Sequence, residues 1–213
     1  MAGGMLTKQA DFLTAKFLND VNDAAAGGVI VSVPSGAPSP SVSQTIAGDR
    51  IVLDDATALA LSDTAVGTLL GGVYMYVQTL STSTASPARG AIAFFQAADL
   101  GSLYRVTADA LPSTAVPTYC AGIFINAITK GNYGWIQVAG AASVLFDSAS
   151  LTAIAAGNWV TAKVSATTAS TADVGAAAGV VTLAALLGVA VGIPTSAVIS
   201  TVMLTRGNFM GRI

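Results

Sequence analysis

Short runs of β-branched and aromatic residues alternate with small polar residues from about residue 42 onward. The runs recur about every ten residues, a spacing typical of the strands of a sandwich or barrel. The pattern therefore predicts a mainly β fold, an antiparallel sandwich or barrel of short strands. The runs are RIVLD, TLLGGVYMYVQTL, GAIAFFQ, LYRVTAD, TYCAGIFINAI, GWIQVAG, ASVLFD, NWVTAKV, GVAVG and AVISTVMLT.

The beginning of the chain has a different pattern. Apolar residues recur every three or four positions between residues 5 and 23, which predicts an N-terminal amphipathic helix. The prolines of PSGAPSPS, residues 34–41, then predict an extended linker. We therefore expect an N-terminal helix or arm with a Pro-rich linker at 1–41, and a β-rich domain at 42–213. Two roles for this helix are open. It packs on its own domain, or it is an arm that binds a partner through Leu6, Leu13, Phe17 and Val21.

One apolar segment, Gly175 to Ile193, contains no charged residue and has small residues at GxxxG spacing. A membrane-spanning helix needs about 20 such residues, but neither an aromatic belt nor a basic cluster flanks this one. We therefore expect LLGVAVG to be a buried strand preceded by a loop. A membrane anchor at 175–193 is the alternative.

Charged residues make up only 9% of the chain, against about 25% in an ordinary soluble domain. The formal net charge is -2, and the acidic residues are all Asp. Because Glu and Lys normally coat the wet face of helices, their scarcity argues against a helix-rich fold. Neighbours in an assembly are expected to cover much of so uncharged a surface. The sequence has no basic stripe, so we expect no nucleic-acid binding.

The residue types that carry most enzyme chemistry are scarce. The chain has no His and one Cys, which excludes Ser–His catalysis, His-ligated metals and CxxC zinc motifs. Asp54 and Asp55 fit a strand end and turn, and a calcium site made by them with Asp49 and Asp63 would lack the usual spacing. We predict no enzyme, no cofactor and no metal. Cys120 is expected to be a small core residue.

Two glycine–asparagine turns precede the only tryptophans. In KGNYGWIQVAG, residues 130–140, the first three residues predict a turn with positive φ. Alternation then places Tyr133 and Trp135 on one face of a strand. AAGNWVTAKV repeats the theme with Trp159. We predict that Trp135 and Trp159 are structural anchors; the alternative is that exposed Tyr133 and Trp135 stack on a sugar.

The same stretch resembles tailed-phage virion structural proteins, in particular capsid decoration proteins of the cement or head-fibre type. These often carry a strand of the form aGxxxNaxxkGxxgxVqvxG, followed by a small-residue turn and further short strands. The resemblance covers about residues 103–205 and does not include the N-terminal helix or linker. The matching residues are Ala121-Gly122-Ile123, Asn126-Ala127, Lys130-Gly131, Trp135-Ile136-Gln137-Val138 and Gly140.

The resemblance implies a β-rich domain, trimeric or monomeric, that binds the outside of a capsid shell without catalysis. The expected partner is the major capsid protein or another virion protein, together with further copies of the chain, a trimer being favoured. The expected location is the capsid exterior of the virion, after assembly in the host cytoplasm. The alternatives are a phage tail or fibre component that binds a receptor or glycan, and a membrane-anchored surface protein using residues 175–193.

Overall fold

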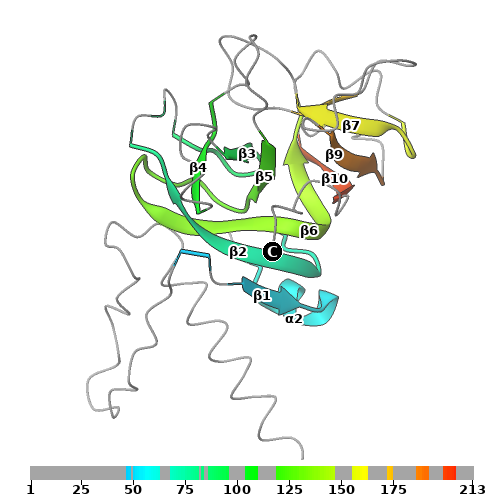
Figure 1. Ribbon diagram of the computed structural model, residues 1–213. Helices are drawn as coiled ribbons and strands as arrows, with labels where there is room; N and C mark the ends of the chain where they lie inside the picture. Colours follow the sequence, from blue (N-terminus) through cyan, green and yellow to red (C-terminus); the bar gives the residue numbers. More distant parts are fainter. Residues whose placement is uncertain are drawn as a thin grey trace, which may run out of the picture.

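The structure is a computed structural model that describes residues 47–48, 50–62, 68–81, 83, 86–95, 104–109, 119–146, 155–162, 172–174, 186–191 and 199–204 (Figure 1). Within these residues the protein is mainly β, which confirms the prediction from the alternating runs. One helix, α2 (Asp55–Ala60), lies among them. The strands described are β1 (Arg50–Leu53), β2 (Gly72–Thr79), β3 (Ile92–Phe95), β4 (Arg105–Thr107), β5 (Tyr119–Phe124), β6 (Tyr133–Leu145), β7 (Trp159–Ala162), β8 (Ala172–Val174), β9 (Leu186–Ala190) and β10 (Ile199–Leu204).

Five of these strands form a closed barrel. β2 pairs with β4, β4 with β3, β3 with β5, β5 with β6, and β6 returns to β2. Four pairings are antiparallel, whereas β2 and β4 run parallel. A closed ring with an odd number of strands cannot alternate in direction all the way round, so one parallel pair is unavoidable. Of the predicted sandwich or barrel, the structure forms a barrel, and its strands are antiparallel, as predicted, except at this pair.

Strand β6 belongs to two sheets. Its first half pairs with β2 and β5 in the barrel, and its second half pairs with β10. It bends at Gly140, where φ is +93° and a Cβ atom would lie 2.8 Å from the Cα of Gly72. Glycine thus lets two backbones approach closely at the bend. The runs GWIQVAG and ASVLFD, predicted as separate strands, are one bent strand of 13 residues.

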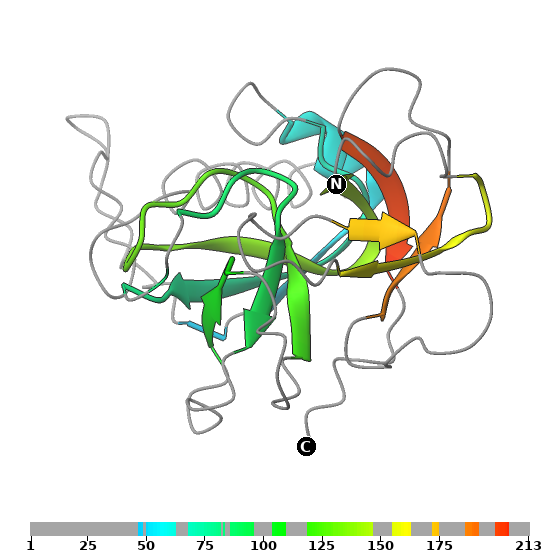
Figure 2. The ribbon, with the colours of Figure 1, turned by 90° about the horizontal axis from the view of Figure 1, so that it is seen from above.

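Beyond the bend, β6 continues through β10, β9, β7 and β8 in a region that we call the second sheet. Figures 1 and 2 both show β7, β9 and β10 beside the barrel. The inward side chains of the second sheet pack on those of β3 and β5, because successive residues of a strand point to opposite faces. This buried cluster contains Ile92, Phe94, Cys120, Ile123, Ala142, Val144, Phe146, Val160, Ala190, Val202 and Leu204.

Two further apolar clusters lie on opposite sides of the β2–β6 pair. One fills the barrel and includes Met75, Val77, Phe124, Ile136 and Val138. The other lies outside the barrel wall, beneath β1 and α2, and contains Leu53, Ala58, Leu61, Leu69, Tyr74, Tyr76, Ile125 and Trp135. The period-2 alternation of β2 and β6 therefore serves two cores at once, which explains why residues 74–77 of β2 and 134–138 of β6 are continuously buried.

Helix α2 follows β1 directly. The side chain of Asp54 caps it by accepting the backbone N–H of Thr57 at 2.8 Å and the Thr57 hydroxyl at 3.1 Å. The sequence predicted a strand end and turn here; the strand does end at Leu53, but a capped helical turn follows. Asp is among the best N-cap residues, and the ATALA that follows favours helix.

The predicted helix at residues 5–23, the linker at 34–41 and the boundary between 1–41 and 42–213 lie outside the described residues. The partner-binding arm with Leu6, Leu13, Phe17 and Val21 therefore stays a prediction.

Candidate partner-binding surfaces

Side chains, not a ligand-sized cavity, fill the part of the barrel that the structure describes. A hollow of about 10 Å³ lies beside the barrel wall, and Arg89, Ile123, Gln137 and Ser143 are among the residues that line it. That volume holds about one water molecule, whereas small-molecule sites occupy roughly 300–1,000 Å³. This hollow therefore has no room for an organic ligand.

Trp135 lies in the cluster beneath β1 and α2 and has no exposed surface. Its ring contacts that of Tyr76, with centroids 5.2 Å apart, and Tyr76 stacks on half-buried Tyr133 at 5.9 Å. Such pairs stabilise a core beyond the burial of their area. A ring without exposed surface cannot stack on a sugar, so the alternative of a sugar platform at Trp135 is wrong.

A polar residue of the same stretch, Gln137, is also internal. Its side chain is 3% exposed, and its amide nitrogen donates to the carbonyl of Ala141 at 2.7 Å and to that of Ala139 at 3.4 Å. These bonds hold backbone groups on both sides of the bend at Gly140. The residues on which the virion-protein resemblance rests thus include a buried tryptophan, a buried glutamine and the bend glycine, all of which shape β6.

The second sheet has an exposed apolar row on the face turned away from the barrel. Trp159 of β7 pairs with Val189 of β9, and Val189 pairs with Met203 of β10, so the three side chains share one face. Trp159 is 52% exposed and Met203 48%, and Val191, two residues after Val189, is 52% exposed. We call Trp159, Val189, Val191 and Met203 the outer apolar row.

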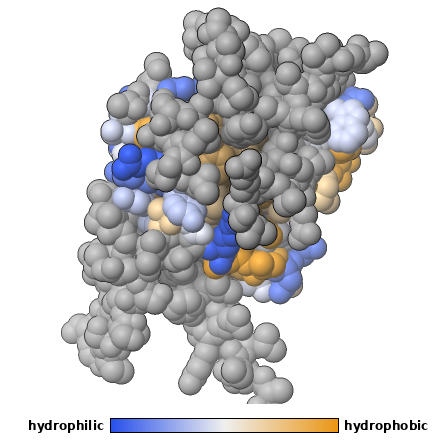
Figure 3. All heavy atoms as spheres, in the orientation of Figure 1, coloured by the Kyte–Doolittle hydropathy of each residue, from blue (hydrophilic) through white to orange (hydrophobic). Residues whose placement is uncertain are grey.

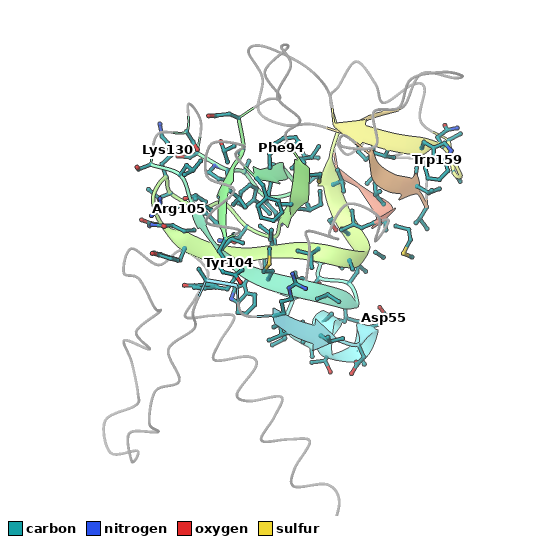
Figure 4. All side chains as sticks on the ribbon, viewed as in Figure 1. Asp55, Phe94, Tyr104, Arg105, Lys130 and Trp159 are labelled. Carbon is teal, nitrogen blue, oxygen red and sulfur yellow. The ribbon has the colours of Figure 1, made fainter. Side chains whose placement is uncertain are left out.

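The figures place this row at one edge of the molecule. Trp159 projects from β7 at the periphery in Figure 4, far from Phe94 in the interior. Figure 3 shows apolar surface on the side where Figure 1 places β9 and β10. No side chain of the row is charged, and neither are its neighbours in the register, Thr201 and Ala141. The predicted anchor role of Trp159 does not match this placement, because about half of the residue is exposed to solvent.

A second exposed apolar surface lies on β1 and α2. Val52 is 76% exposed and Leu59 63% exposed. Asp54 and Asp55 lie between them in the sequence, and Asp55 accepts the backbone N–H of Gly71 at 2.9 Å. The hydrogen bonds from Thr57 hold the pKa of Asp54 below its ordinary value, so this carboxylate is ionised at neutral pH. We call it the β1–α2 surface.

The other residues considered for chemistry are the candidate metal ligands and the single thiol. Among the described residues, no three His, Cys, Asp or Glu side chains gather as metal ligands would; Asp49 and Asp63 lie outside these residues. Cys120 is buried at 2% exposure, and burial raises the pKa of its thiol to about 12. A thiol held protonated is a poor nucleophile.

The apolar segment 175–193 contains strand β9 at Leu186–Ala190, as the sequence predicted for LLGVAVG. None of the helices within the described part of the chain has the length and apolarity to cross a membrane. A continuous helix over residues 175–193 therefore disagrees with the structure.

Sequence reasoning missed the outer apolar row. Alternation alone puts Met203 on the face opposite Val202, but it does not reveal that β7, β9 and β10 align Trp159, Val189 and Met203 side by side.

Comparisons with protein-family models, with curated proteins and with solved structures give no match to the chain.

Proposed function

We propose that the protein is a non-enzymatic virion structural protein, a capsid decoration or cement protein that binds the outside of a phage shell. The observation that carries the proposal is the outer apolar row: large side chains about half exposed on a rigid sheet, in a chain with only 9% charged residues. Contiguous exposed apolar residues mark interaction sites. The resemblance of residues 121–140 to decoration proteins supports a shell as the larger partner.

The mechanism is cementing through many modest contacts. Neither the outer apolar row nor the β1–α2 surface is large enough alone to give tight binding, because stable interfaces bury about 800 Å² on each partner. A trimer that attaches at several points on a repeating lattice gains affinity through effective concentration. Two separate apolar surfaces suit this arrangement, since one can contact other copies of the chain while the other contacts the major capsid protein.

Labelling of intact particles tests the proposal. Antibodies against the purified protein should label the outside of phage heads in electron micrographs, and the protein should sediment with shells. A head-bound protein that resists labelling until the shell is opened would contradict a decoration role.

A tail or fibre component that binds a glycan is the second candidate, and the exposed ring of Trp159 favours it. Exposed tryptophans stack on sugars. Labelling of tails, together with glycan binding that Trp159→Ala abolishes, would support this function over cementing. The membrane-anchored alternative is not proposed, because β9 occupies residues 186–190 of its anchor segment.

A further inference from the structure

We infer that the outer apolar row is the docking site for residues 5–23 of a neighbouring copy of the chain. The inference rests on the proposed function in treating the protein as part of an assembly, and it names the partner of one surface. The occupant is the segment whose apolar stripe contains Leu6, Leu13, Phe17 and Val21.

The size of the row favours a helix over a second sheet as its partner. A large aromatic side chain buries roughly 150–250 Å², so three half-exposed side chains and Val189 offer on the order of 300 Å². A face-to-face dimer needs about 800 Å² on each side. An amphipathic helix needs only a row of anchor side chains, one for each turn.

The spacing of the segment matches the spacing of the strands. Leu13, Phe17 and Val21 are four residues apart, so on a helix they recur about every 6 Å along the axis. The strands that carry Trp159, Val189 and Met203 are neighbours, separated by about 4.8 Å. Three successive apolar side chains of the segment can therefore meet three successive strands.

Charge distinguishes the outer apolar row from the β1–α2 surface. The polar positions of the segment carry charges of both signs, Lys8, Asp11, Lys16, Asp20 and Asp23, while its stripe is apolar. The β1–α2 surface carries Arg50, Asp54 and Asp55, whose charged groups would lose water beneath a docked apolar stripe. The outer apolar row has no charged side chain and imposes no such cost.

The route of the chain lets the segment reach a neighbouring copy. Gly48, near the start of the described chain, donates its N–H to the carbonyl of Tyr76 at 2.7 Å. Residues 47–48 lie on the far side of the barrel from β7 and β9 in both ribbon views (Figures 1 and 2). Residues 24–46 could extend about 75 Å at roughly 3.3 Å per residue, and their prolines favour an extended path. A linker of this reach, joined to the chain on the far side of the barrel, is long enough to place the segment on a neighbouring copy.

Two full-length double variants test the inference by complementation. Leu13→Ser/Phe17→Ser removes the stripe, and Val191→Ser/Met203→Ser removes part of the row. Each variant alone should lose self-association roughly a hundredfold or more, because two apolar anchors are lost. Mixed in equal amounts they should associate in pairs, since one supplies an intact row and the other an intact segment. Sedimentation velocity measures this.

Fluorescence provides the second readout. Trp135 has no exposed surface, so acrylamide quenching of the full-length protein reports on Trp159. Docking shields Trp159; quenching should therefore rise in Leu13→Ser/Phe17→Ser and stay unchanged in the controls Lys16→Gln and Leu59→Ser, which alter a polar position of the segment and the β1–α2 surface.

Three outcomes overturn the inference. They are association unchanged in either double variant, absence of complementation between folded variants, and increased quenching in a protein that is monomeric throughout, which would mean docking within one copy. Circular dichroism establishes that each variant is folded before it is scored. Because no shell is present, this experiment can fail while head labelling succeeds, and the reverse also holds.

Discussion

The turns Thr129–Asn132 and Ala155–Asn158 are built alike, yet the tryptophans that follow them have opposite surroundings. In each turn the N–H of the asparagine donates to the carbonyl of the first residue, at 3.0 Å and 3.1 Å. The third residue in each is a glycine with positive φ, +84° at Gly131 and +87° at Gly157. This is the pattern of a turn that requires a left-handed residue at its third position.

The strands after the turns differ in what covers them. β6 lies between β2 and β5, with β1 and α2 over its outer face, and it buries Trp135 completely. β7 lies one strand from the end of the second sheet and carries Trp159 on the uncovered face. Counted from the asparagine, Trp159 occupies the position of Tyr133, not that of Trp135. A turn therefore sets where a strand begins, while the layers above the strand decide which side chains are buried.

The largest difference between the two regions is expected for Trp135→Ala. Loss of a fully buried tryptophan leaves a cavity and typically costs about 3–5 kcal/mol. The free energy of unfolding, measured by urea denaturation, should fall by that amount, or the protein should fail to fold. A loss below about 0.5 kcal/mol, the range of surface substitutions, would remove the contrast between the tryptophans.

Gly140→Ala should cause the second-largest loss in the free energy of unfolding. The residue has positive φ, and a Cβ atom would press on the backbone of Gly71 and Gly72. Strain at such positions costs about 1–3 kcal/mol before any clash is counted, so we expect a loss of at least about 2 kcal/mol in the same denaturation experiment. A neutral result would show that the bend in β6 does not depend on glycine.

The buried side of the second sheet should make the stability of the protein depend on pH, because an ionisable thiol lies there, whereas the outer apolar row contains no ionisable group. Cys120 lies beneath the sheet, and burial raises its pKa to about 12 from 9.0. Between these values the unfolded chain binds fewer protons than the folded protein, so the free energy of unfolding falls as pH rises above 9. From about pH 8 to pH 10 the loss should be on the order of 1 kcal/mol. Urea denaturation at both pH values measures it.

Cys120→Ala serves as the control for this pH effect. Without the thiol, the loss between the two pH values should largely disappear. A slope that persists in the variant would mean that other groups cause it, such as the buried phenol of Tyr74, whose pKa burial also raises.

Substitution of the two turn glycines, Gly131 and Gly157, should reduce stability by equal amounts, whereas substitution of the two tryptophans should not. A Cβ at Gly157 would meet nothing within 4 Å, and one at Gly131 would meet only the Cβ of Ser81, at 3.5 Å, and its Cα, at 3.9 Å. Gly131→Ala and Gly157→Ala should therefore each cost about 1 kcal/mol, through backbone strain alone. Thermal unfolding of the pair tests this; costs that differ by more than about twofold would contradict the equivalence of the turns.

Trp159→Ala should have the smallest effect on folding. A half-exposed side chain on an uncovered face lies near the range of surface substitutions, about 0.5 kcal/mol. Its loss should be visible instead in self-association. Destabilisation as large as that of Trp135→Ala would restore the anchor role first predicted for Trp159.

The sequence predicted those features of the fold that depend on neighbouring residues. It did not predict the features that depend on contacts between strands far apart in the chain. Alternation placed Trp135 and Ile136 on opposite faces of one strand, and they do lie in different clusters. Barrel closure depends on β2 meeting both β4 and β6, which no local pattern encodes. The sequence alone predicted that a strand ends at Gly140, because a glycine can either end a strand or allow it to bend. The structure shows one bent strand. The cap at Asp54 was missed although its signal, an Asp before ATALA, is in the sequence.

The candidate site was less predictable than the fold. The scarcity of charge indicated a covered surface, but it did not say which one. The exposure of Trp159 follows from its strand position and from the pairing of β7 with β9, both of which depend on contacts between residues about 30 positions apart in the chain.

The continuity of β6 has a mechanical consequence. Because one unbroken strand contributes hydrogen bonds to both the barrel and the second sheet, a pull on the second sheet reaches the barrel along covalent peptide bonds. Two sheets joined only by a loop could separate under tension one after the other. Here, detaching either sheet means stripping β6 from its neighbours, so barrel and second sheet should hold or yield together.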